Sequence, residues 1–143
     1  MVDVEAIASR FSHLRQYLKV LQELQRVSKN TFINDYHYYG LAERYLQLAI
    51  ECILDVGNSL IISFDLRKPS DRQEIIDILE EGKIISSLLA TRLSGIAGFR
   101  NLLIHEYIKI DREKVYQILK NRVPDIETYA KGITRFLKKK KYL

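Results

Sequence analysis

A short stretch near residue 100 sets four chemically capable side chains into an otherwise apolar run. They are Arg100, Asn101, His105 and Tyr107, within the segment GFRNLLIHEY. An imidazole titrates near neutral pH, so His105 could both donate and accept a proton. A guanidinium is always charged and presents a planar fork of donors, so Arg100 could bind a phosphate group.

This set of side chains matches the needs of RNA cleavage without a metal. The 2′-hydroxyl is then the nucleophile, and the reaction needs a base, an acid and a cation for the charged phosphorane. His105 could carry the proton transfers, which are typically worth about 10²–10⁴-fold in rate, and Arg100 could stabilise the developing charge. No HExxH motif or carboxylate cluster accompanies them, so we expect neither a metal nor a cofactor.

The spacing of these residues raises a geometric problem. Asn101 lies four residues before His105 on the same helical face, where it could bond one imidazole nitrogen and fix the tautomer. Arg100 lies five residues before His105, which is about 140° around an unbroken helix. The two would meet only if the helix unwinds between them, or if two subunits of a symmetric dimer share one cleft.

The segment RNLLIHEY resembles the R-N-x-x-x-H-x-Y signature of the HepT-like branch of the HEPN superfamily, whose members are small helical bundles. The stretches ERYLQLAIEC (43–52) and DVGN (55–58) resemble the long second helix of that family, and Phe99 precedes the Arg-Asn pair. The resemblance implies a metal-independent ribonuclease that is the toxin of a toxin–antitoxin pair. It also implies a homodimer with the cleft at its interface, with Arg100 and His105 catalytic and Asn101 supporting them.

The same resemblance implies a partner and a means of neutralisation. The partner would be a minimal nucleotidyltransferase antitoxin that transfers AMP to Tyr107. The added phosphate would compete with RNA for Arg100 and block the cleft. Two other hypotheses remain open: a non-catalytic, nucleotide-binding subunit of a nucleotidyltransferase complex, and a helical interaction module whose polar motif only organises the dimer.

Apolar residues recur at helical spacing along the whole chain of 143 residues. The sequence predicts one all-α domain spanning 1–143, an up-and-down four-helix-type bundle with additional short helices. The second long helix should be the most buried, since its apolar residues cover two faces. The first helix should end near Ser28, and Asn34 or Asp35 should cap the second. A short helix should follow from Ser70 to Gly82, and one continuous helix should run from Ile85 through the motif. Asp111 should cap a fifth helix, and Pro124 should lie in the first turn of a sixth.

Several other polar residues are weaker candidates for a functional role. Glu51 and Asp55 lie four apart in the long apolar helix, either as an exposed or capped pair or as an acidic pair facing a site. Lys109 and Arg112 flank the motif and could add to an RNA-binding patch. The aromatic cluster around His37, at 36–39, could stack on RNA bases, but a packing role at the start of a helix is favoured.

The remaining features concern charge and compartment. The net charge is +5, with a run of four lysines at 138–141 that could attract phosphates or simply cap a solvated helix end. Cys52 is the single cysteine and should be a small buried side chain, whereas His13 should lie on the surface. The chain has no apolar run of about 20 residues and no signal-like start, so we expect a cytoplasmic protein with no membrane association.

Overall fold

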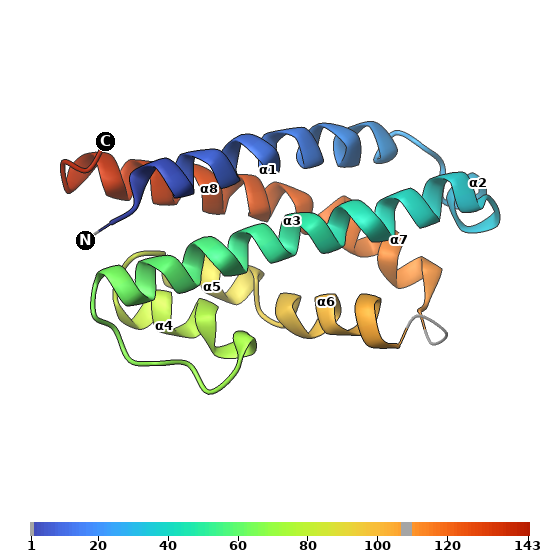
Figure 1. The fold of residues 1–143 in the computed structure, drawn as a ribbon. Coiled ribbons are helices and arrows are strands. Elements are labelled where there is room, and N and C mark those ends of the chain that lie inside the picture. Colours follow the sequence, from blue (N-terminus) through green and yellow to red (C-terminus); the bar gives the residue numbers. More distant parts are fainter. Residues whose placement is uncertain (1, 107–109) are drawn as a thin grey trace.

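The computed structural model describes residues 2–106 and 110–143, and all regular secondary structure in these ranges is helical (Figure 1). This confirms the expected all-α class. The elements are α1 (Val4–Leu24), α2 (Lys29–Asn34), α3 (Tyr36–Ser63), the 3₁₀ helix η1 (Arg72–Glu74), α4 (Ile75–Glu81), α5 (Ser87–Arg92), α6 (Ile96–His105), α7 (Arg112–Asn121) and α8 (Val123–Lys139).

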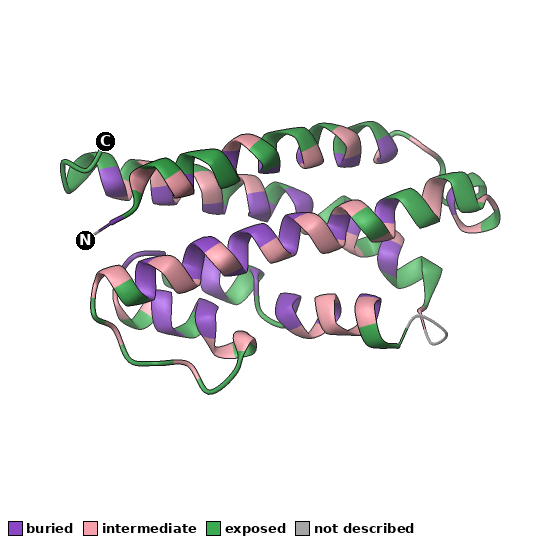
Figure 2. Ribbon diagram, viewed as in Figure 1, coloured by how far each residue is buried: buried purple, intermediate pink, exposed green. Residues whose placement is uncertain are grey.

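The long helix α3 is the centre of the bundle. Helices α1 and α8 lie on one side of it and α4 and α6 on the other (Figure 1), and each of these four packs against α3. Buried residues run along most of its length (Figure 2), which confirms that its two apolar faces meet different neighbours. By length and composition α3 could span a membrane, but 56% of its most apolar 18-residue stretch is buried inside the bundle. That burial is typical of the core helix of a helical bundle.

Polar side chains start several helices where the sequence predicts them. The Asp35 carboxylate accepts a hydrogen bond from the His37 backbone N–H at 2.9 Å and so begins α3. The Asp111 carboxylate accepts from the Glu113 N–H at 3.0 Å and begins α7. Pro124 lies in the first turn of α8, where its missing N–H leaves no bond unmade.

Two expected boundaries are wrong. The first helix ends at Leu24, and Ser28 instead begins the short helix α2 by accepting from the Thr31 N–H at 3.3 Å. The expected capping box at Ser70 is replaced by Asp71, whose carboxylate accepts from the Gln73 N–H at 2.9 Å.

The expected continuous helix from Ile85 through the motif is also wrong, because Gly95 divides it. The backbone of Gly95 has φ +80°, a left-handed conformation that only glycine adopts without strain. Helix α5 therefore ends at Arg92, and α6 begins in a new direction at Ile96. Gly82 does follow α4, but with φ −80°, and the left-handed residue there is Lys83.

Candidate active site on helix α6

Helix α6 is held against α3 by its apolar face. Phe99 and Leu103 are buried and α6 packs against α3, and Arg100 reaches Glu51 on that helix. The Arg100 guanidinium donates to Oε1 of Glu51 on α3, from Nε at 3.2 Å and from Nη2 at 2.9 Å. The side chains are 21% and 29% exposed, so this ion pair is partly shielded from water but still reachable.

The guanidinium has a second partner in its own helix. Its Nη1 donates to the side-chain oxygen of Asn101 at 3.1 Å. A guanidinium carries five N–H groups, and these three bonds use three of them. Arg100 is therefore held in one orientation and keeps donors available for an anion.

Asn101 is oriented differently from the sequence prediction. Its oxygen accepts from Arg100, and no hydrogen bond joins it to His105 within the described part of the chain. The structure therefore assigns Asn101 to the guanidinium rather than to the imidazole.

His105 is the last residue of α6 and is exposed to solvent. The helix is unbroken from Ile96 to His105, so Arg100 and His105 point about 140° apart within one chain. One protomer alone does not bring the two side chains around a common point. Neither side chain is enclosed in the packed interior.

Glu51 is the partner of Arg100 that sequence reasoning did not identify as such. The sequence singled out Glu51 and Asp55 as a pair, but the structure separates their roles. Asp55 accepts from Arg72 Nη2 at 2.7 Å, whereas Glu51 binds Arg100 and also accepts from Gln47 at 3.3 Å. The available signal was a row of polar residues at 47, 51 and 55, each four apart on one face of an apolar helix.

A small hollow of about 160 Å³ adjoins Glu51 on the side of α1. His13, at its rim, is exposed as expected. Cys52 also lines it, and its thiol donates to the Arg10 carbonyl at 3.2 Å. Burial, aided by the negative charge of Asp55, raises the pKa of the Cys52 thiol to about 11, so the thiol stays protonated at neutral pH and is a poor nucleophile.

The other candidate residues lie apart from this ion pair. The guanidinium of Arg112 sits 4.0 Å from the centre of the Tyr39 ring and donates to the Ile33 carbonyl at 3.1 Å, so it ties α7 to the start of α3. Burial raises the pKa of Glu43, which the charge of Arg112 partly offsets. Tyr107 and Lys109 lie outside the described residues.

The aromatic cluster at the start of α3 is mainly structural. His37 Nδ1 lies 2.8 Å from the Asp35 carboxylate, and its ring stacks on Tyr36 at 4.2 Å. Tyr38 and Tyr39 pack against the core. This arrangement fits the packing hypothesis for 36–39, although Tyr36 itself is exposed. No group of three or more potential metal-ligating side chains occurs in the described ranges.

The comparison with protein families decides the identity of the fold. A family model described as Ribonuclease HepT-like matches residues 14–133. The chain belongs to the HepT-like family. The matched range contains the whole of α6, so Arg100, Asn101 and His105 lie in the family's domain. The last turn of α8 and the lysine run lie outside it.

Curated proteins and solved structures resemble this HepT-like chain over most of its length. YutE of Bacillus subtilis is 30% identical over 95 residues, 66% of each chain. Its structure, of a cytosolic protein, has a TM-score of 0.84 and covers 97% of this chain and 93% of that one at 24% identity. The tRNA nuclease HepT of Aphanizomenon flos-aquae is 24% identical over 131 residues, 92% of this chain and 89% of that protein.

A third relative was solved as a complex. The structure of a tri-AMPylated Shewanella oneidensis HEPN toxin with an MNT antitoxin has a TM-score of 0.83 at 20% identity, covering 94% of this chain and 99% of that one. At this identity the likeness shows the shared fold.

Proposed function

We propose that this HepT-like protein is a metal-independent endoribonuclease, the toxin of a toxin–antitoxin pair, and that it works in the cytoplasm as a homodimer. The observation that carries the proposal is that Arg100, held by Glu51, and the imidazole of His105 are both accessible to solvent on the same helix, α6. Two relatives, named tRNA nuclease and mRNA nuclease, support RNA as the substrate class. YutE, a cytosolic protein, supports the compartment.

The direction of the two side chains supports a homodimer. Arg100 and His105 diverge on an unbroken helix, so a single protomer offers the scissile phosphate only one of them at a time. A two-fold axis beside α6 would bring the Arg100 of one protomer toward the His105 of its partner. Both copies of His105 would then face one cleft, where one could act as base and the other as acid.

The proposed reaction begins with proton transfer from the 2′-hydroxyl to a neutral His105. The 2′-oxygen attacks the adjacent phosphorus, and negative charge grows on the phosphorane oxygens beside Arg100. A protonated His105 then gives its proton to the departing 5′-oxygen, leaving a 2′,3′-cyclic phosphate. None of these proposed steps requires a metal ion.

Glu51 and Asn101 act as positioning residues in this scheme. Their bonds to Arg100 hold the guanidinium before RNA arrives, so less conformational freedom is lost on binding. Tyr107 is the proposed site of adenylylation by a nucleotidyltransferase antitoxin, a role supported by the tri-AMPylated Shewanella toxin bound to its antitoxin. The added phosphate would compete with RNA for Arg100.

Expression of the protein without an antitoxin tests the nuclease proposal. We expect arrested growth and degraded RNA, both lost in Arg100→Ala and His105→Ala. Matched controls are Arg26→Ala and His37→Ala, which remove an exposed arginine and an exposed histidine away from α6. Cleavage by the purified protein should survive EDTA.

The contrary outcomes are distinct. Equal toxicity of the variants, or cleavage abolished by EDTA, contradicts the proposed mechanism. Tight binding of ATP in calorimetry together with no cleavage favours instead a nucleotide-binding subunit of a nucleotidyltransferase complex, in which Arg100 holds a nucleotide phosphate.

A further inference from the structure

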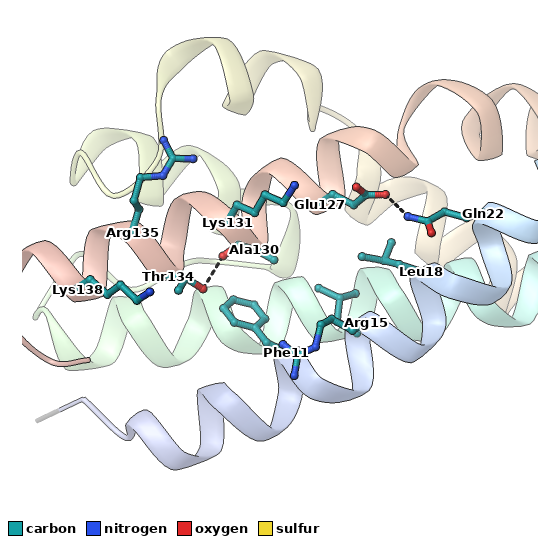
Figure 3. Close-up of a pocket in the computed structure, with 11 residues that line it drawn as sticks. Phe11, Arg15, Leu18, Gln22, Glu127, Ala130, Lys131, Thr134, Arg135 and Lys138 are labelled. Carbon is teal, nitrogen blue, oxygen red and sulfur yellow. Dashed lines mark hydrogen bonds between the residues drawn. The ribbon is translucent and has the colours of Figure 1, made fainter.

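A second concave surface lies on the opposite side of the bundle from α6. Helices α1 and α8 border a groove of about 620 Å³ (Figure 3). Its floor is apolar, formed by Phe11, Leu14 and Leu18 of α1 together with Ala130 of α8. The α1 residues that line it span 11 to 22, or roughly 16 Å at 1.5 Å per residue. The groove is long enough for an extended ligand.

The walls of the groove are strongly cationic. Four basic side chains line it, namely Arg15, Lys131, Arg135 and Lys138. The carboxylate among the lining residues is Glu127, and it already accepts a hydrogen bond from Gln22 at 2.5 Å. None of the four cations forms an ion pair with a described residue, whereas Arg67, Arg72, Arg92 and Arg100 elsewhere each do.

The helix dipole accounts for only part of this charge. Lys138 lies in the last turn of α8, where a cation complements the negative helix end. Lys131 and Arg135 lie further back, four residues apart, a spacing at which like charges destabilise a helix. Arg15 comes from another helix altogether. These four cations line one groove without an ion pair to a described residue, and such a concentration of positive charge favours an anionic ligand.

We propose that this groove binds a single-stranded segment of RNA, remote from the bond that is cleaved. The cations would contact successive phosphates, and the apolar floor would receive ribose or base faces, the combination by which proteins hold single strands. The inference rests on the proposed function, since a ribonuclease already takes a polyanion as substrate and one ligand then accounts for both surfaces. Helix α3 lies between the groove and α6 (Figure 1), so only RNA longer than the reacting nucleotides would reach both.

The test measures binding apart from cleavage. A fluorescein-labelled 20-nucleotide oligouridine is titrated with the His105→Ala protein and followed by anisotropy between 50 and 300 mM KCl. Adding Arg15→Gln and Lys138→Gln removes one cation from each wall. If each contacts a phosphate, the slope of log K against log salt should fall by about 1.4, and the affinity at 0.1 M salt by about 25-fold.

The matched control removes one arginine and one lysine elsewhere, Arg26→Gln with Lys68→Gln, both exposed. It changes the net charge equally and should leave the slope unchanged. Equal losses in the two double variants, or none in either, overturn the proposal, as does binding of an acidic peptide but not of RNA. Circular dichroism checks that all variants are folded.

Cleavage kinetics separate this inference from the nuclease proposal. These experiments use protein in which His105 is intact. There, Arg15→Gln with Lys138→Gln should raise KM for the 20-nucleotide RNA and leave the cleavage of a tetranucleotide unchanged. If the variant cleaves both RNAs as the wild type does, the groove proposal is refuted and the nuclease proposal is retained. If RNA binding depends on the groove but no RNA is cleaved, the groove proposal is retained and the nuclease proposal is refuted.

Discussion

Gly57 offers the sharpest test of how α3 is packed. It is buried in the middle of the helix, next to side chains of α4 and α8. A Cβ atom added there would lie 2.6 Å from Cγ2 of Ile75 and 3.0 Å from the hydroxyl of Tyr129. Neither neighbour can move easily, because Ile75 is buried and the Tyr129 hydroxyl donates to the Ile53 carbonyl at 2.7 Å.

The expected magnitude follows from opposing effects. Alanine is favoured over glycine in a helix interior by about 1 kcal/mol. Overpacking a well-filled core costs about 1–3 kcal/mol, and displacing the Tyr129 hydroxyl costs about 1 kcal/mol more. Gly57→Ala should therefore lower the free energy of unfolding by about 2 kcal/mol. Gly132→Ala in α8 meets nothing within 4 Å, so it should raise stability by about 0.5–1 kcal/mol.

Urea unfolding followed by circular dichroism measures both variants against the wild type. At roughly 3 °C per kcal/mol for a domain of this size, the melting temperatures should move in opposite directions, down by about 6 °C and up by about 2 °C. A Gly57→Ala protein as stable as Gly132→Ala would refute the close approach of α4 and α8 to α3.

Two further predictions concern charged residues. Glu51→Ala removes the carboxylate that binds Arg100 and should lower kcat for RNA cleavage about tenfold, which corresponds to about 1.4 kcal/mol. Glu51→Gln should lose less activity, because its amide oxygen still accepts from the guanidinium. Equal losses in the two variants would contradict a positioning role. The hydrogen bond from Arg67, with a second from Ser70, lowers the pKa of Glu74 to about 2, below its ordinary 4.5. The stabilising contribution of Glu74 is therefore complete above pH 4.5 and is lost as the pH falls toward 2. Thermal melts should show a decline over that interval that is smaller in Glu74→Gln, and identical pH profiles would refute it.

The sequence by itself determined the class of fold and the residues of interest. Apolar spacing near 3.6 predicted the long helices, and Asp35, Asp111 and Pro124 marked three of their starts, because both signals act within a few residues of chain. The order of residues from Arg100 to Tyr107 was enough to indicate the HepT-like family. Local signals failed where two neighbouring residues could each form a cap, as at Ser70 and Asp71.

Only the tertiary structure decided which charges meet. The bond between Arg100 and Glu51 joins residues 49 positions apart, and it forms because α6, which begins after the turn at Gly95, packs against α3. Likewise, Arg15 and Lys138 share a groove because α1 and α8 pack side by side. Helical periodicity predicts which face of a helix a residue occupies. Which other helix packs against that face depends on the tertiary structure, and the spacing of residues along the chain does not predict it.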